Sequence, residues 1–206
     1  MSQTTPSAPA ASRTRLSPEQ RREQLLHLGV RLLATRSLDE LSIDLLAEEA
    51  GISRGLLYHY FGSKQAFHEA VVRHAADDLI AQTTPPTEGE PMERLLASVT
   101  AYVDYVIANH EGYVSLVKAA AGGNESLRAI YEDARSALNS RIFREDVQGE
   151  IIPDTPANRL VVRGWSAMVE ELVLSWIDDP RDVTRDQLLA IITASLPAVV
   201  EVVPEG

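Results

Sequence analysis

The chain has 206 residues, of which 45% are hydrophobic, no cysteine and a formal net charge of −11. This length can bury a full core, as one all-helical unit or as a small domain fused to a larger one, and the lack of cysteine excludes disulfides and thiolate metal sites and fits a reducing, cytoplasmic compartment. No apolar run approaches the roughly 18–20 residues of a membrane span, so no membrane association is predicted.

Residues 1–16, MSQTTPSAPAASRTRL, are of low complexity and lack the apolar core of a secretory signal. They predict a disordered tail, in which Arg13 and Arg15 could enter a minor groove as a flexible arm or could be idle surface charge. Residues 1–36 carry a net charge of +4, with six arginines against two glutamates, whereas residues 75–206 carry −12. The acidic part therefore lies downstream, where it would repel DNA from the wrong face.

A capping box at residues 17–20 predicts the start of a first helix, which runs to about residue 35. Two short helices joined by a glycine-containing turn are predicted next, for residues 42–64. Ser42 and Ser53 can cap the two short helices, and Gly51 can end the first of them. Apolar residues recur at helical spacing on one side of each. Residues 17–64 therefore predict a three-helix domain with a helix-turn-helix motif.

In such a motif the second helix enters the major groove with its N-terminal residues facing the bases. Arg54 can present a bidentate fork to guanine or pair with a phosphate, and it is the expected base-reading residue. Rings that follow it can donate hydrogen bonds to phosphates, and Lys64 stands at a helix start that favours an anion. The candidate DNA contacts are Ser42, Ser53, Arg54, Gly55, Tyr58, His59, Tyr60 and Lys64.

This segment resembles the DNA-binding domain of the TetR family of bacterial transcriptional regulators. The family pattern is a hydroxyl residue opening the second helix, then A-x-x-A-G-V-S-x-G-x-L-Y-x-H-F-x-x-K. It is matched by Ser42, Ala47, Ala50, Gly51, Ile52, Ser53, Gly55, Leu57, Tyr58, Phe61 and Lys64. The chain differs at His59-Tyr60, where x-His is common. Asp44 lies near a position that reaches bases in some members, and this acid could accept from a cytosine amino group or face solvent.

The remaining sequence predicts helices alone, without an alternating strand pattern or an internal repeat. Residues 65–206 are expected to form a larger helical domain, after a linker at residues 83–91 that interrupts the helices. The predicted helices after the motif span approximately 64–81, 92–109, 111–121, 125–147, 157–177 and 184–203. The expected fold is all-α.

The resemblance implies a homodimer, in which the last two helices pair with their mates in a four-helix interface. Candidate interface residues are Leu160, Gly164, Trp165, Leu172, Trp176, Leu189, Ile192 and Leu196. It also implies an inducer pocket among the middle helices, for an apolar or amphipathic molecule that releases a repressor from a palindromic operator. Candidate pocket residues are Tyr102, Tyr105, His110, Tyr113, Leu116, Val117, Trp165 and Met168.

Enzyme motifs are missing from the sequence. The histidines at 27, 59, 68, 74 and 110 show no HxxxH spacing, and neither G-x-x-x-x-G-K nor G-x-S-x-G occurs. We therefore predict a DNA-binding regulator without catalytic activity, cofactor or metal site. The alternative is a helical ligand-sensing or protein-binding module that does not bind an operator, and a steep loss of DNA affinity with salt would exclude it.

Overall fold

The computed structural model describes residues 16–146 and 152–203, and within these ranges every regular element is a helix, which confirms the all-α prediction. The predicted tail, with Arg13 and Arg15, lies outside the described residues apart from Leu16. The helices are α1 (Pro18–Leu33), α2 (Ile43–Ala50), α3 (Arg54–Phe61), α4 (Lys64–Gln82), α5 (Pro91–Ala108), α6 (His110–Ala121), α7 (Glu125–Glu145), α8 (Pro156–Asp178) and α9 (Arg185–Val200).

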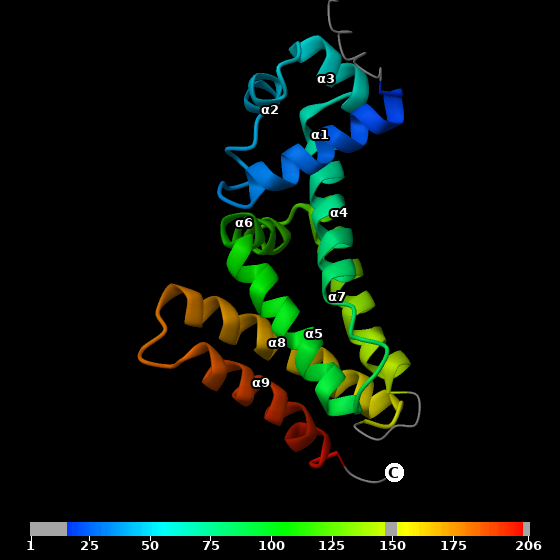
Figure 1. Ribbon diagram of the computed structural model, residues 1–206, viewed down its shortest axis with the longest axis vertical. Coiled ribbons are helices and arrows are strands. Elements are labelled where there is room, and N and C mark those ends of the chain that lie inside the picture. Colours follow the sequence, from blue (N-terminus) through cyan, green and yellow to red (C-terminus); the bar gives the residue numbers. More distant parts are fainter. Residues whose placement is uncertain (1–15, 147–151, 204–206) are drawn as a thin grey trace, which may run out of the picture.

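The first three helices form a head at one end of an elongated molecule, and α5–α9 form a body (Figure 1). The long helix α4 connects them, because it packs on α1 and α3 in the head and on α5 and α7 in the body. The predicted division after residue 64 therefore falls at the start of a helix that both parts share.

Serine caps fix the starts of the head helices. The side chains of Ser17, Ser42, Ser53 and Ser63 each accept a hydrogen bond from a backbone amide in the first turn of the helix that follows. Gly51 ends α2 in the left-handed conformation, with φ of 63°, which a residue without Cβ adopts at little cost. These local signals hold α2 and α3 in the predicted helix-turn-helix order.

Two clusters of buried side chains stabilise the two parts. The head core contains Leu25, Leu41, Leu46, Leu57 and Phe67, all almost fully buried, and it also takes in apolar residues of α7. The body core joins α5, α8 and α9 through Val103, Val106, Val162, Val173, Ile192 and Leu196. Because α7 contributes to the head core, the head packs directly on the body.

Close helix contacts mark this junction. A Cβ added at Gly112, near the start of α6, would lie 2.4 Å from the carbonyl oxygen of Leu33 at the end of α1. Three residues further along α6, the Ser115 hydroxyl accepts a hydrogen bond of 2.8 Å from the backbone amide of Leu38. Helix α6 is therefore in direct contact with the end of α1 and with the loop that follows it.

Candidate DNA-binding surface and ligand cavity

Helix α3 presents a polar face at the end of the head. Leu57 and Phe61 are buried beneath it, and this orientation leaves the other side of the helix in solvent. The five predicted contacts on α3 and its N-cap that face away from the core are exposed: Ser53, Arg54, Gly55, Tyr58 and His59. A Cβ added at Gly55 would meet no atom within 4 Å, so a DNA backbone could approach this point closely.

The other three predicted contacts differ in exposure. Lys64 is exposed at the first position of α4, beside the free amides of a helix start. Ser42 and Tyr60 are half-buried, and Tyr60 packs against the head core. The ring of Tyr60 also stacks edge-on with His59, at 5.8 Å between centroids. Packing thus holds Tyr60 in place.

Arg54 has a partner that the sequence did not identify. Its Nε lies 2.6 Å from Oδ1 of Asp44, in the first turn of α2, and the two side chains are 63% and 61% exposed. The acid that could have faced a base or solvent therefore pairs with the predicted base-reading arginine. This pairing holds the guanidinium at the surface, on the side of α3 nearest α2.

A cavity opens in the body among α5, α6, α7 and α8, next to the loop that joins α4 to α5. It encloses about 970 Å³ of space, including its opening to solvent. Its apolar wall consists of Leu95, Val99, Leu138, Ile142, Trp165 and Val169. A mostly apolar lining with a few polar groups is typical of small-molecule sites.

Three tyrosines and a glutamate form the polar network at one side of this cavity. The Tyr113 hydroxyl donates to Oε2 of Glu170 at 2.8 Å, and the Tyr131 hydroxyl donates to Oε1 of the same carboxylate at 2.7 Å. The Tyr102 hydroxyl lies 2.9 Å from that of Tyr113. Burial raises the pKa of Tyr102, of Tyr113 and of Tyr131 above the ordinary value. All three hydroxyls therefore stay protonated and can act as hydrogen-bond donors.

Three arginines also line the cavity, and two of them are engaged by protein groups. Arg94 pairs with the Glu145 carboxylate, and Arg141 donates to the carbonyl oxygen of Ile80 at 2.7 Å. Arg135 differs, because its guanidinium lies over the ring of Tyr131, at 5.4 Å from the centroid. Neither Arg135 nor Arg141 pairs with a carboxylate among the described residues, but the N–H groups of Arg141 already donate to Thr83 and Ile80, so those of Arg135 are the ones left for a ligand.

Some of the predicted pocket residues line this cavity and others do not. Tyr102, Tyr113 and Trp165 line it. The described lining does not include Tyr105, His110, Leu116, Val117 or Met168. Tyr105 instead donates to the carbonyl oxygen of Ala75 at 2.7 Å, Leu116 packs on the head core, and Met168 is exposed on α8. His110 lies 3.6 Å from Asp178. Helical spacing alone did not separate the cavity face from its neighbours.

The polar lining residues were missed. In the sequence, nothing distinguishes three of these residues from ordinary surface charges of α7 and α8, so no local signal indicated Glu170, Arg135 or Arg141. Their position follows only from how α7 and α8 pack around the cavity.

The predicted dimer surface also changes. Trp165, Leu189, Ile192 and Leu196 are buried inside the protomer, where α8 packs on α9, and the Trp165 indole donates to the Ser195 hydroxyl at 2.8 Å. Leu172 and Trp176 are half-buried. Leu160, at 73% exposed, and Gly164 remain accessible on the outer face of α8. The four buried residues are thus core residues, and a partner could contact the outer face.

Among the described residues, none of the helices combines the length and apolar content that a bilayer crossing requires.

Comparison with known proteins identifies both parts of the chain. Residues 25–71 match the family described as bacterial regulatory proteins, tetR family, and residues 91–196, more than half of the chain, match the tetracyclin repressor-like C-terminal domain. A TetR-family transcriptional regulator from Streptomyces coelicolor is 33% identical, with a TM-score of 0.77 over 89% of this chain and 82% of that one.

Named relatives include both activators and repressors. The HTH-type transcriptional activator FasR of Mycolicibacterium smegmatis is 24% identical over 174 residues, which are 84% of this chain and 79% of FasR. The HTH-type transcriptional repressor KstR2 of the same organism is 34% identical over 95 residues, but these are 45% of this chain and 46% of KstR2. Transcriptional regulation rather than catalysis is what these proteins share. On these grounds, the chain belongs to the TetR family of DNA-binding transcriptional regulators.

Proposed function

We propose that this protein is a homodimeric repressor that reads a palindromic operator with α3 of each protomer and releases it when a small amphipathic acid enters the body cavity. One observation carries the proposal: α6 lines the cavity through Tyr113 and, one residue earlier, packs Gly112 against the end of α1. A ligand that displaces α6 would therefore push directly on the head. Because bacterial DNA lies in the cytoplasm, we also propose that compartment.

Operator reading is supported by the exposed polar face of α3. Arg54 stands at the first position of this helix, where side chains reach base edges, and Tyr58 follows one turn later on the same side. Lys64 adds a positive charge beside the helix start of α4, suited to a phosphate. The strongly acidic body would favour approach of DNA to the head alone.

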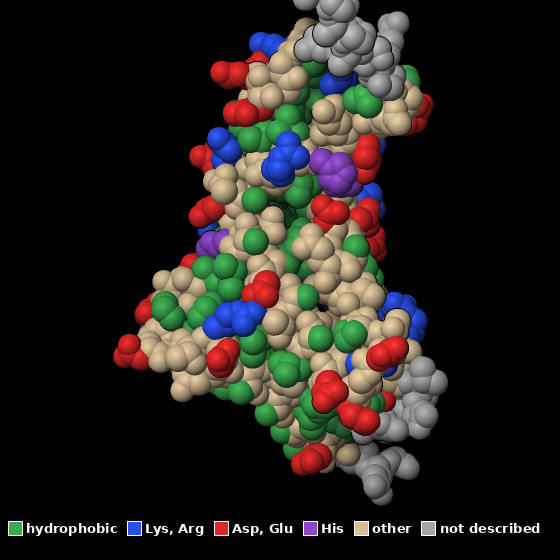
Figure 2. All heavy atoms as spheres, viewed as in Figure 1, with side chains coloured by type: hydrophobic (Ala, Val, Ile, Leu, Met, Phe, Trp, Pro, Cys, Tyr) green, Lys and Arg blue, Asp and Glu red, His purple; other side chains and the backbone are tan. Residues whose placement is uncertain are grey.

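Dimerisation is supported by the outer face of α8 and α9. Two half-sites of a palindrome need a twofold-symmetric protein, since the half-sites lie about 34–36 Å apart. Exposed small or apolar residues follow one another at helical spacing on this face: Leu160, Gly164, Ala167 and Met168 on α8, with Ile191, Ala194 and Ala198 on α9. Figure 2 shows hydrophobic side chains at the surface of the lower half of the molecule, where these helices lie. Small residues there would let the helices of a mate approach closely.

The ligand chemistry follows from the lining of the cavity. Its apolar wall suits a hydrocarbon part, and the unpaired guanidinium of Arg135 suits an anionic group. The Glu170 carboxylate accepts a hydrogen bond from a tyrosine on each of its oxygens. We therefore favour an amphipathic carboxylate, held by Arg135, over a neutral hydrocarbon.

Operator release can be tested in two steps. Footprinting on DNA that flanks the protein's own gene would locate the operator, and fluorescence anisotropy would then follow its release by decanoate, with decanol as the uncharged control. We expect release by decanoate alone and loss of this response in Arg135→Gln. Equal release by both compounds, or an unaltered response in the variant, would refute the assignment of Arg135.

Direction of regulation needs a separate measurement. In a transcription assay with purified polymerase and the footprinted promoter, a repressor lowers transcript and an activator raises it. A protein whose DNA affinity is weak and nearly independent of salt would instead be a ligand-sensing module without operator binding, because counterion release makes true operator binding steeply salt-dependent.

A further inference from the structure

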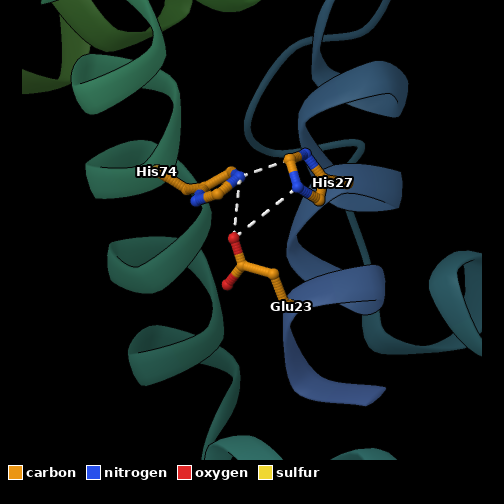
Figure 3. A group of neighbouring side chains, drawn as sticks. All are labelled: Glu23, His27 and His74. Atoms are coloured by element: carbon orange, nitrogen blue, oxygen red, sulfur yellow. Dashed lines mark hydrogen bonds and ion pairs between the residues drawn. The ribbon is translucent and has the colours of Figure 1, made fainter. Parts of the chain in front are cut away.

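Three side chains that the function above does not use meet at the junction of the head with α4. Glu23 and His27 lie one turn apart on α1, and His74 faces them from α4; their polar ends point toward one another (Figure 3). The His74 Nε2 atom lies 3.2 Å from His27 Nδ1 and 3.8 Å from Glu23 Oε1. The same carboxylate oxygen lies 3.6 Å from His27 Nε2.

These separations match the spacing of ligands around one metal ion. In a tetrahedral zinc site with bonds of about 2.0–2.1 Å, neighbouring ligand atoms lie about 3.3–3.4 Å apart. The three distances scatter around that value, but two of them end on different nitrogens of the His27 ring. Because the ligand atoms of all three residues lie within 4.8 Å of one another, a turn of the His27 ring would bring one nitrogen toward both partners. His27 presents a ring nitrogen to each of the other two residues, and either nitrogen can serve as the ligand.

The donor set selects the kind of cation. Two imidazoles and one carboxylate suit a first-row transition ion such as Zn²⁺, whereas Mg²⁺ and Ca²⁺ prefer oxygen ligands alone. Glu23 and His27 are 53% and 52% exposed, and His74 is 15% exposed. This exposure gives an ion a path to the site and leaves a fourth position for water. Figure 2 shows histidine side chains at the surface between α1 and α4, next to acidic ones.

We propose that Glu23, His27 and His74 form a Zn²⁺ site that links the head to the long helix α4. No motif could have indicated it, because its ligands come from two helices almost 50 residues apart in sequence. The helices approach closely here, since Gly29 has no Cβ; a Cβ at this position would lie 2.6 Å from Cγ2 of Val71. The ion would cross-link α1 to α4 next to this tight contact and resist their relative movement.

A second reading of the same distances is a hydrogen-bonded trio without metal. One imidazole N–H would donate to the other ring, and a protonated ring would pair with Glu23. The two readings differ in what a metal does to the protein. A trio without metal affinity gains nothing from added Zn²⁺, whereas a metal site gains stability by mass action.

Equilibrium dialysis of tag-free, chelator-treated protein against Zn²⁺, with metal quantified by mass spectrometry, tests the proposal. We expect one Zn²⁺ per chain, and the same stoichiometry for Co²⁺, with the strong visible absorption of a four-coordinate ion. At Zn²⁺ about 100-fold above its dissociation constant the melting temperature should rise by about 5–10 °C. An excess of Mg²⁺ should produce neither effect.

Variants locate the site. Glu23→Gln, His27→Gln and His74→Gln should each remove the bound Zn²⁺ and the rise in melting temperature, while His59→Gln, an exposed imidazole on α3, should keep both. Glu23 and His27 are half-exposed, so their variants should fold even if the His74 variant does not. Retention of stoichiometric Zn²⁺ in the Glu23 and His27 variants, or its absence from the unmodified protein, would overturn the proposal. Slower amide exchange of α1 with Zn²⁺ would support the cross-link.

Discussion

Replacing Arg54 by alanine tests the assignment of the base-reading residue. In the free protein this guanidinium pairs with Asp44 at 2.6 Å, and both side chains are more than 60% exposed. Solvent screening limits such a pair to about 0–1 kcal/mol. A bidentate contact to a base edge is worth about 1–3 kcal/mol of discrimination. The base contact is therefore the stronger of the two. When an operator binds, Arg54 should leave Asp44 or contact Asp44 and the base together.

These magnitudes predict different effects on folding and on DNA binding. Arg54→Ala should lower the melting temperature by no more than about 4 °C, because about 1 kcal/mol shifts a chain of this length by about 2–4 °C. Operator affinity should fall by about 1–3 kcal/mol per half-site, which is about 5- to 150-fold each. Affinity for random DNA should change much less.

Fluorescence anisotropy on the footprinted operator and on a scrambled duplex of equal length would measure both affinities, at one fixed salt concentration. Arg128→Ala, which removes an exposed arginine from α7 in the body, is the matched control for net charge and should leave the ratio of the two affinities unchanged. An equal loss on operator and scrambled DNA would refute the reasoning, since Arg54 would then contact phosphate and carry no sequence information.

Three further variants probe other parts of the molecule. Lys64→Ala should weaken operator and random DNA about equally and reduce the salt slope by about 1 per protomer in a titration with salt; an unchanged slope would remove Lys64 from the interface. Gly112→Ala should destabilise the fold by about 1–3 kcal/mol, since the added Cβ would meet the backbone of Leu33, and Gly55→Ala, whose Cβ meets nothing, is the control for thermal melting. Burial lowers the pKa of His68, whose Nε2 lies 2.5 Å from the carbonyl oxygen of Leu41. As pH falls, the imidazole therefore takes up a proton in the unfolded chain before it does so in the folded protein, and the free energy of unfolding should decrease below about pH 6.5. Thermal melts at about pH 7.5 and about pH 5.5 measure this decrease, which should be smaller in His68→Gln.

The head could be predicted from sequence because its signals are local. The serine caps, Gly51 and the apolar spacing of α2 and α3 each act within a few residues, and the structure keeps them in the predicted register. Which polar side chains are exposed on α3 follows from the same helical period. The contact of Arg54 with Asp44 could not be derived in this way, because it depends on the angle at which α3 crosses α2.

The body was predictable only as a set of helices. Apolar stripes on α8 and α9 indicated that each helix has a packed face. The stripes alone do not distinguish a face that packs on another helix of the same protomer from one that packs on a second protomer. Ile192 and Leu196 belong to the inner face and are fully buried, whereas Leu160 and Ile191 point outward. The zinc ligands and the cavity arginines are likewise brought together by tertiary packing between α1 and α4 or around α7 and α8.

The strength of the proposed switch can be compared with what the cavity offers. Moving a two-state equilibrium from 1:99 to 99:1 requires about 5.5 kcal/mol of differential binding. A twofold dimer has two cavities, so each needs to supply about half of this. A charge-assisted hydrogen bond is worth about 1.5–3 kcal/mol. A carboxylate that reaches Arg135 only in the released state would therefore come close to sufficing at both sites. A ligand that binds both states with equal affinity would not shift the equilibrium between them, however tightly the apolar wall bound its hydrocarbon part. The decisive property of an inducer is thus the contact with Arg135 made when α6 has moved, rather than the size of its hydrocarbon part.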